Sequence, residues 1–156
     1  MGGDAKYMTI RRATYRETQK ILNHSLEVLK EATMGYIQAS REKAFQMVSP
    51  FLTDGGHYLV NIENNGIQGW VGVGKTIDYY SEELIGFIPE IYVLPQYRKR
   101  RVAEKLCREA LRQLKEMGYK KVQLNVFSGN HAKHLYQNLG FQEVSTLMEK
   151  KLDLDI

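Results

Sequence analysis

The order of apolar and polar residues along the chain predicts an alternation of strands and helices. Two-residue alternation is typical of half-buried strands, and apolar residues three and four positions apart are typical of helices. Strands are predicted at residues 7–12, 57–63, 67–77, 84–94, 121–127 and 141–151. Helices are predicted from Thr14, from about Arg41, over the stretch that ends at Gly118, and from Asn130 to Gly140. This order predicts an α+β fold, a mixed, mostly antiparallel sheet flanked by helices.

Short local signals refine these boundaries. Thr14 and Glu17 have the spacing of a capping box. Pro50 is expected to kink or end the second helix, because proline lacks an N–H group. Asn65-Gly66 is a strong hairpin signal, and Gly118 stands where a helix C′ glycine is expected. The strand, helix and strand that span 84–127 predict a βαβ crossover with parallel strands.

Composition limits the classes of protein that fit. The chain has 156 residues, of which 43% are hydrophobic and 26% charged, so we expect one globular domain over 1–156, with residues 1–6 disordered. The first eight residues lack an apolar leader, and no apolar run approaches the roughly 20 residues of a membrane helix. A single cysteine, Cys107, excludes an internal disulfide and suggests the reducing cytoplasm. Because Cys107 lies in an apolar helical stripe, we interpret it as a core residue.

The most informative segment is the basic stretch between the fourth predicted strand and the following helix. Four consecutive cations, 98–101, stand at the start of a helix that has no Ser, Thr, Asp or Asn at its N-cap. A helix N-terminus beside Arg and Lys is suited to a phosphate or pyrophosphate, and the net charge of +4 suits an anionic ligand. A solvated basic loop is one alternative. A nucleic-acid patch is a weaker one, since no second basic stripe with interleaved aromatics is present.

Two motifs in this region resemble a known family. The pattern Val-Leu-Pro-x-Tyr-Arg-x-x-x-Val-Ala over 93–103 resembles the acetyl-CoA-binding loop of the GNAT acetyltransferase superfamily, usually Gln/Arg-x-x-Gly-x-Gly/Ala. Residues 130–141 are similar to the family segment Asn-x-x-Ala-x-x-Leu-Tyr-x-x-x-Gly-Phe. The motifs are about thirty residues apart, with a helix and a strand between them. The resemblance covers roughly 7–151, is specific only over about 90–141, and implies the GNAT acyl-CoA acyltransferase fold.

The resemblance implies acetyl-CoA or coenzyme A as co-substrate, and it assigns residues to it. Backbone groups near Tyr92 and Val93 would pair with the pantetheine arm, and Asn130 would contact that arm. Tyr136 would stand beside the thioester sulfur and protonate the leaving thiolate. The pyrophosphate would be held by the loop residues Arg98, Lys99, Arg100, Arg101, Val102 and Ala103.

One departure from the family pattern concerns Arg101, which occupies the position of the first loop glycine. Glycine permits a positive φ and a close approach of backbone to ligand, which arginine resists. Either this loop needs no positive φ, or cofactor binding is altered or weakened. In the second case the positive charge of Arg101 is a candidate compensation for the lost close approach.

Several candidate residues also have purely structural interpretations. Asn130 is a candidate helix cap, and Tyr136 a candidate core aromatic. Glu90, three residues before Val93, is the first candidate for the general base; the alternatives are a surface or salt-bridged glutamate and a water relay. In the family, the connector around Tyr36 lines the acceptor site. No metal is predicted, because His131 and His134 lack further ligand candidates.

The predicted function is transfer of an acetyl group from acetyl-CoA to a primary amine by direct attack in a ternary complex. The acceptor is an unidentified small molecule or peptide. One alternative is a GNAT-fold protein that binds CoA as a sensor or regulatory module without turnover. A second is a basic nucleic-acid-binding module, which the placement of the basic run disfavours. No membrane partner is expected, and the resemblance to the family favours a homodimer.

Overall fold

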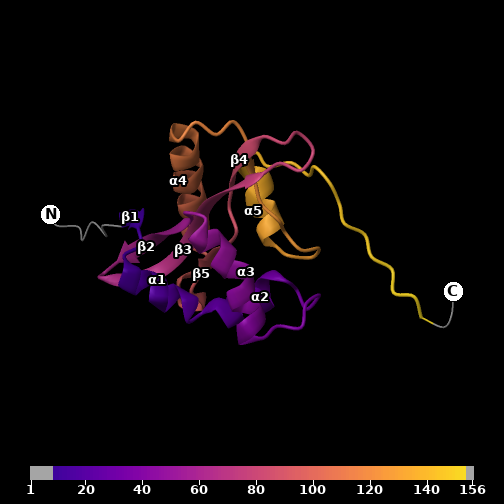
Figure 1. Ribbon diagram of the computed structural model, residues 1–156. Coiled ribbons are helices and arrows are strands. Elements are labelled where there is room, and N and C mark those ends of the chain that lie inside the picture. Colours follow the sequence, from indigo (N-terminus) through magenta and orange to yellow (C-terminus); the bar gives the residue numbers. More distant parts are fainter. Residues whose placement is uncertain (1–8, 154–156) are drawn as a thin grey trace.

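The computed structural model describes residues 9–153 and has a mixed sheet with helices on both faces (Figure 1). The expected disorder of residues 1–6 lies outside the described residues. The strands are β1 (Thr9–Arg12), β2 (His57–Glu63), β3 (Gly66–Ile77), β4 (Leu84–Phe87), β5 (Ile91–Val93) and β6 (Val122–Gln123). The helices are α1 (Tyr15–Leu22), α2 (Ser25–Ala32), α3 (Arg41–Thr53), α4 (Val102–Glu116) and α5 (Ala132–Asn138). The predicted α+β class is confirmed.

Sheet topology confirms the predicted meander and crossover. The strand order is β1-β2-β3-β4-β6, with β5 also paired to β3. These pairs are antiparallel except for β4 and β6, which are parallel as the βαβ pattern predicts. Asn64 and Asn65 both have positive φ at the β2–β3 turn, as a two-residue hairpin of the favoured hand requires.

Two apolar clusters cover the two faces of the sheet. Helix α4 contributes Leu106, Cys107 and Leu114 to one of them, where they pack against Leu59 and Val71 of the sheet. Cys107 is fully buried, which confirms that it is a core residue. This burial raises the pKa of its thiol to about 12. The other cluster joins α1 and α2 to β2 and β3 around Trp70. Figure 1 shows α1, α2 and α3 on the side of the sheet opposite α4.

The fourth predicted strand, 84–94, is broken into β4 and β5, so the expectation of one continuous strand is wrong. Pro89 lies in the break and has no N–H to donate to a ladder. The chain nevertheless stays against β3, because the Gly72 amide donates to the Glu90 carbonyl at 2.9 Å. Both halves pair with β3, but only β4 has a second strand partner, β6.

Three other boundaries also differ from the prediction. The first helix is interrupted at Asn23 and His24, because Asn, His and Ser are poor helix formers and stand together there. Helix α3 continues past Pro50 to Thr53. The strand predicted at 121–127 comprises only Val122–Gln123. Beyond Gln123 it has no neighbouring strand, because the chain after β4 turns to pair with β3 as β5.

The strand predicted at 141–151 is the largest error. The segment is extended and exposed, and it pairs with no strand among residues 9–153. Its last backbone hydrogen bond to the body is from the Phe141 amide to the Tyr136 carbonyl. Figure 1 shows this segment, in yellow, running away from the remainder of the molecule.

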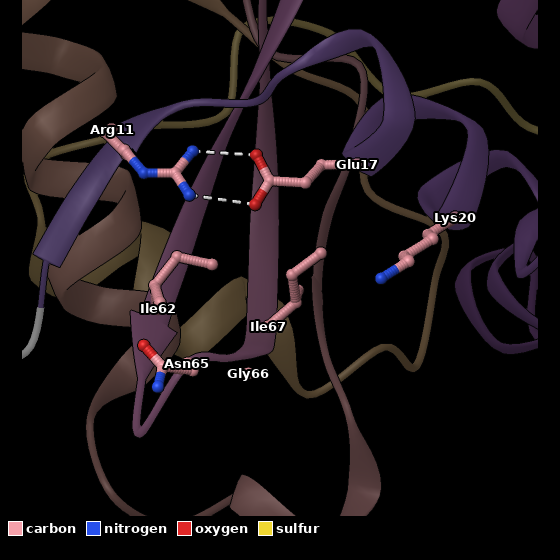
Figure 2. A pocket seen from close by; sticks show the side chains of 7 residues that line it. All are labelled: Arg11, Glu17, Lys20, Ile62, Asn65, Gly66 and Ile67. Atoms are coloured by element: carbon pink, nitrogen blue, oxygen red, sulfur yellow. Dashed lines mark hydrogen bonds and ion pairs between the residues drawn. The ribbon is translucent and has the colours of Figure 1, made fainter.

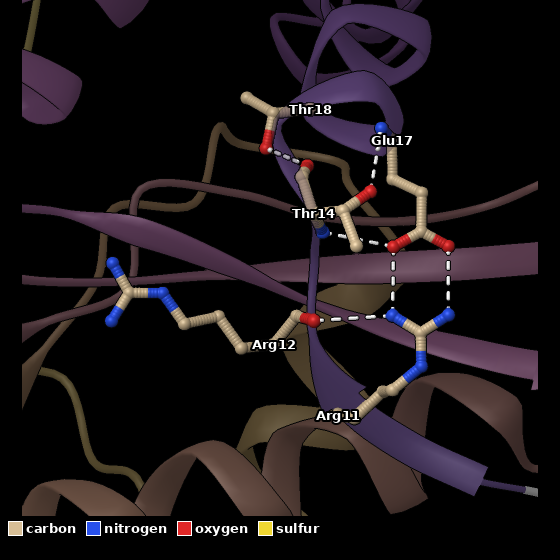
Figure 3. Close-up of polar contacts among 5 residues, drawn as sticks. All are labelled: Arg11, Arg12, Thr14, Glu17 and Thr18. Atoms are coloured by element: carbon tan, nitrogen blue, oxygen red, sulfur yellow. Dashed lines mark hydrogen bonds and ion pairs between the residues drawn. The ribbon is translucent and has the colours of Figure 1, made fainter.

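The junction of β1 and α1 is fixed by the predicted capping box (Figure 3). The Glu17 amide donates to Thr14 Oγ1 at 3.2 Å, and the Thr14 amide donates to Glu17 Oε1 at 2.9 Å. Arg11 also donates two hydrogen bonds to the same carboxylate, at 2.7 and 2.9 Å. These contacts lower the pKa of Glu17 to about 2, with the Arg11 hydrogen bonds as the main cause.

Replacing Glu17 with Gln tests this junction, because Gln retains the capping geometry and removes the charge. We expect the free energy of unfolding at pH 7 to fall by about 1–2 kcal/mol, allowing for solvent screening. Since the folded pKa is lowered, the contribution is complete above the ordinary pKa of 4.5 and is lost as pH falls toward 2. Urea unfolding at several pH values should show wild type and variant converging over this range. A constant difference would refute the assignment.

The close approach at Gly72 gives a second prediction. A Cβ atom there would lie 2.6 Å from Pro89 Cγ. Gly72→Ala should therefore lower the free energy of unfolding by about 1–3 kcal/mol, as overpacking does. Gly66→Ala is the matched control on the same strand, since its Cβ would have 3.7 Å to the nearest atom. Equal effects of the two substitutions in chemical denaturation would contradict the packing argument.

Candidate cofactor-binding site and active site

The open edge of β5 is the first part of the site. The Glu90 carbonyl accepts a hydrogen bond from the Gly72 amide, and the Leu94 amide donates one to the Gln68 carbonyl, both on β3. Because backbone groups alternate between the two edges of a strand, those of Glu90, Tyr92 and Leu94 face β3. The N–H and C=O groups of Ile91 and Val93 therefore face the other edge, which has no strand partner among residues 9–153. Sequence reasoning named Tyr92 and Val93 but missed Ile91, because the register follows from pairing with β3.

The basic loop leads from this edge to α4 through the short 3-10 turn η1 (Pro95–Tyr97). Lys99 and Arg101 both adopt left-handed conformations, with φ of 64° and 63°. The loop thus takes the angle for which the family uses glycine, and the possibility that no such angle is needed is wrong. For a residue with a Cβ atom, this conformation costs about 1–2 kcal/mol.

The N-terminus of α4 has the uncapped amides that the sequence predicts. Arg101 is its N-cap residue and forms no side-chain capping bond. The first intrahelical hydrogen bond at this end is from the Lys105 amide to the Arg101 carbonyl. The amides of Val102, Ala103 and Glu104 precede it and have no helical acceptor. Together with the exposed side chains of Lys99 and Arg100, these amides form a surface suited to an anion.

Arg98 has a different position from the one predicted. Its Nε donates to the Val93 carbonyl at 2.9 Å, and its terminal nitrogens contact both carboxylate oxygens of Glu31 at 2.8 Å. The guanidinium also lies over the Tyr92 ring, 5.2 Å from its centroid. In this structure Arg98 ties α2 to the end of β5, and its guanidinium points to these partners instead of extending beside Lys99 and Arg100.

Glu90 lies on the opposite face of the sheet from α4, within the cluster around Trp70. Its carboxylate accepts a hydrogen bond from Tyr58 Oη at 2.7 Å and one from Trp70 Nε1 at 3.1 Å. Burial raises the pKa of Glu90, and these two bonds offset the shift only in part. Its side-chain partners are neutral donors, so Glu90 is neither a surface glutamate nor a salt-bridged one. A carboxylate with a raised pKa is suited to accept a proton near neutral pH.

Asn130 connects the start of α5 to the end of α2. Its Oδ1 accepts a hydrogen bond from the Ala132 amide at 2.9 Å. The N-cap residue of α5 is His131, which makes no side-chain capping bond, so Asn130 holds the first helical amide from one position before the cap. Its Nδ2 donates to the Ala32 carbonyl at 3.4 Å. At the other end of α5, Gly140 has φ of 96° and follows the C-cap, as predicted.

Tyr136 is largely enclosed on α5. Its ring makes an edge-on contact with Phe141, with centroids 5.9 Å apart. Burial, and secondarily the nearby Cys107, raises the pKa of Tyr136 to about 12. Among residues 9–153 no hydrogen-bond partner is found for its hydroxyl, so this donor remains available to a ligand.

The connector after α2 approaches the loop before α5. Tyr36 stacks on Phe127 with ring centroids 5.9 Å apart, and Met34 Cε lies near Gly129. The sequence analysis named Tyr36 for the acceptor site and did not name Phe127, its stacking partner. Its signal was its position at the end of an alternating apolar stretch, beyond the last paired residue of β6.

A separate hollow lies beside β1, α1 and the β2–β3 hairpin (Figure 2). Its volume is about 240 Å³, and the Arg11–Glu17 ion pair forms part of its wall. These two charges satisfy each other, and none of the lining residues belongs to the predicted cofactor site.

Within the part of the chain that the structure describes, no helix is long and apolar enough to cross a membrane. Over the same residues, His, Cys, Asp and Glu side chains form no group of three that would suit a metal ion.

Comparison with known proteins decides the family. The model of the acetyltransferase (GNAT) family matches residues 16–141. The chain belongs to the GNAT family. It is 30% identical over 99 residues to the uncharacterized N-acetyltransferase YycN of Bacillus subtilis strain 168, a match that spans 62% of each chain.

Solved structures show the same GNAT fold. A protein assigned as an acetyl transferase from Pyrococcus furiosus superposes with a TM-score of 0.81 at 23% identity, covering 94% of this chain and 100% of that one. The aminoglycoside N-acetyltransferase AAC(6')-Iy, solved in complex with CoA, superposes with a TM-score of 0.69 at 19% identity. That superposition covers 97% of this chain and 98% of the other.

Strain at Arg101 is directly testable in this GNAT protein. Arg101→Gly should raise the free energy of unfolding by up to about 1 kcal/mol, because glycine adopts the left-handed conformation without penalty. The exposed ion pair with Glu104, 3.8 Å long, should contribute little. Arg100→Gly is the matched control: its φ is not positive, so glycine there should destabilise by about 0.5–1 kcal/mol. Chemical denaturation showing the same sign for both variants would contradict the strain argument.

Proposed function

We propose that this protein transfers an acetyl group from acetyl-CoA to a primary amine in a ternary complex. The observation that supports the proposal best is the continuity between the open edge of β5 and the uncapped, basic N-terminus of α4. A linear ligand with an amide-bearing arm and a pyrophosphate matches these two features in that order. AAC(6')-Iy, which shares the fold, was solved with CoA.

On the cofactor side, we assign the pantetheine arm to the N–H and C=O groups of Ile91 and to the N–H of Val93, since the Val93 carbonyl already accepts a hydrogen bond from Arg98 Nε. The pyrophosphate is assigned to the amides of Val102 and Ala103 with the cations of Lys99, Arg100 and Arg101. Asn130 is assigned to the arm from the side of α5. Arg98 acts as a positioning residue, because its guanidinium holds the end of β5 against Glu31.

On the acceptor side, the amine must lose a proton before or as it attacks. A primary amine with pKa near 10.4 is less than about 0.1% neutral at pH 7. Glu90, directly or through a water molecule, accepts that proton, and its hydrogen bonds to Tyr58 and Trp70 fix the carboxylate. Tyr36 and Phe127 form an aromatic wall for the acceptor.

In the chemical step, the amine nitrogen bonds to the thioester carbonyl carbon and the C–S bond breaks. The Val93 amide polarises the carbonyl oxygen. Tyr136 donates its proton to the leaving thiolate. The ammonium nitrogen loses two protons in all: one passes to Glu90 before attack, and one leaves the tetrahedral adduct and returns through water to the Tyr136 phenolate after Tyr136 has protonated sulfur. The products are an N-acetylated amine, CoA as its thiol, and one proton that Glu90 releases to solvent. Co-localisation of the two substrates supplies several kcal/mol of the barrier reduction.

The setting of the reaction follows from cysteine chemistry. Cys107, the one cysteine of the chain, forms no disulfide and is buried. We therefore propose a cytoplasmic enzyme whose acceptor is a soluble small-molecule or peptide amine and not a nucleic acid.

Tyr136→Phe tests the mechanism, because it removes only the hydroxyl. We expect kcat to fall at least about tenfold, the low end for a lost proton donor, while CoA affinity and the fold are retained. Thiol release with acetyl-CoA and a panel of amines measures kcat. Thermal unfolding with and without CoA measures binding. A hundredfold excess of CoA over its Kd should raise the free energy of unfolding by about 2.7 kcal/mol.

Different failures have different meanings in this experiment. If the wild-type protein binds CoA but releases no CoA thiol with any amine of the panel, the sensor alternative is favoured. Absence of a thermal shift at millimolar CoA would refute the cofactor site. An unchanged kcat in Tyr136→Phe would leave Tyr136 as a packing residue, and Phe141→Leu is the matched control for packing against that ring.

A further inference from the structure

The ring of Phe51 on α3 lies in a trough on the face of the sheet that carries the Glu90 side chain. The trough is bordered by Gly56, Gly72 and Gly74, where an added Cβ atom would meet the ring. At Gly74 this atom would lie 2.9 Å from Phe51 Cδ2, and at Gly72 it would lie 3.3 Å from Phe51 Cζ. Because these three residues lack side chains, there is room for one aromatic ring directly against the sheet.

The trough is next to the proposed general base. Tyr58, whose hydroxyl donates to Glu90 at 2.7 Å, makes an edge-on contact with the Phe51 ring at a centroid distance of 5.4 Å. Gly72 pairs with Tyr58 across one edge of β3, and its amide donates to the Glu90 carbonyl across the other. Phe51 is only partly buried, so part of its ring is accessible to a ligand beside this cluster.

A second ring borders Glu90 from the opposite direction along β3. Gly72 is level with Glu90, and Trp70 lies two residues before Gly72, on the side away from Gly74. The Trp70 Nε1 group donates to the Glu90 carboxylate at 3.1 Å. The carboxylate therefore lies between the ring of Trp70 and the ring of Phe51. The space between two packed rings suits a narrow alkyl arm, because protein interiors pack without large voids.

We infer that Phe51 is the specificity-determining residue of the acceptor site, and that its ring restricts the acceptor to primary amines on a slender, unbranched arm. This inference rests on the proposed function, in which Glu90 accepts the proton of the amine. With Phe51 in the trough, a bulky group near the amine nitrogen has no space along β3. A hydrophobic pocket discriminates by about 10–200-fold between substrates that differ by a small apolar group, so the place of one ring decides which amines react.

Phe51→Ala tests the inference, because it opens the trough to the acceptor. The probes are ethylamine with phenethylamine and butylamine with phenylbutylamine, pairs that differ by a terminal phenyl ring. The readout is the ratio of kcat/KM within each pair, measured by thiol release from acetyl-CoA. We expect Phe51→Ala to shift this ratio about tenfold or more toward the ring-bearing amine, whose ring takes the place of the removed one. Phe51→Leu should shift it about threefold, and it carries the test if the alanine variant does not fold.

Two further variants separate specificity from packing. Leu52 is the neighbouring residue on α3 and packs on the same cluster around Trp70, so Leu52→Ala should lower stability without changing the ratio. In the Phe51→Ala background, Gly74→Ala places a methyl group in the vacated trough. The double variant should lose the gain by about threefold or more, because the trough is partly refilled. Circular dichroism and a cooperative thermal transition show whether each variant is folded.

The possible failures are distinguishable. An unchanged ratio in Phe51→Ala, an equal change in Leu52→Ala, or no reversal by Gly74→Ala would overturn the inference while the proposed function stands. A wild-type protein that acetylates phenylbutylamine as well as butylamine, or only branched and ring-bearing amines, would overturn it too. If the wild-type protein releases no thiol with any amine, the proposed function is refuted, and this inference with it.

Discussion

The absence of an N–H group on Pro89 is the constraint on which the rest of the structure depends. It breaks one long strand into β4 and β5, which both pair with β3, and only β4 also pairs with β6 on its other edge. The second edge of β5 therefore stays open, and that edge ends at the loop before α4. The glycine at position 72 permits the break, because it lets the Pro89 ring lie directly on β3.

The candidate site consists largely of backbone groups. The edge groups of Ile91 and Val93 and the first amides of α4 are the donors, and the side chains around them fix their position. Arg98 holds β5 to α2, and the left-handed residues Lys99 and Arg101 turn the loop into the helix. Backbone donors are independent of side-chain identity, so the proposed site is compatible with arginine where the family pattern has glycine.

The sequence predicted what depends on local chemistry. The capping box at Thr14, the Asn65-Gly66 turn, Gly118 and Gly140 at helix ends, and the buried helix face with Cys107 depend on short-range preferences and are all confirmed. What depends on pairing partners was not predictable. The edge orientation of Ile91 depends on register with β3, and the contacts of Arg98 depend on α2, sixty-seven residues earlier. Residues 141–151 have strand alternation but no strand partner among residues 9–153.

The central claim is that a CoA arm pairs with the open edge of β5, and amide-resolved NMR tests it most directly. On titration with CoA, the amides of Ile91 and Val93 should shift and exchange more slowly with deuterium, together with those of Val102 and Ala103. The Tyr92 amide, already directed at β3, should keep its exchange rate. Slower exchange at Tyr92 alone, or CoA binding that leaves Ile91 and Val93 unchanged, would contradict the account.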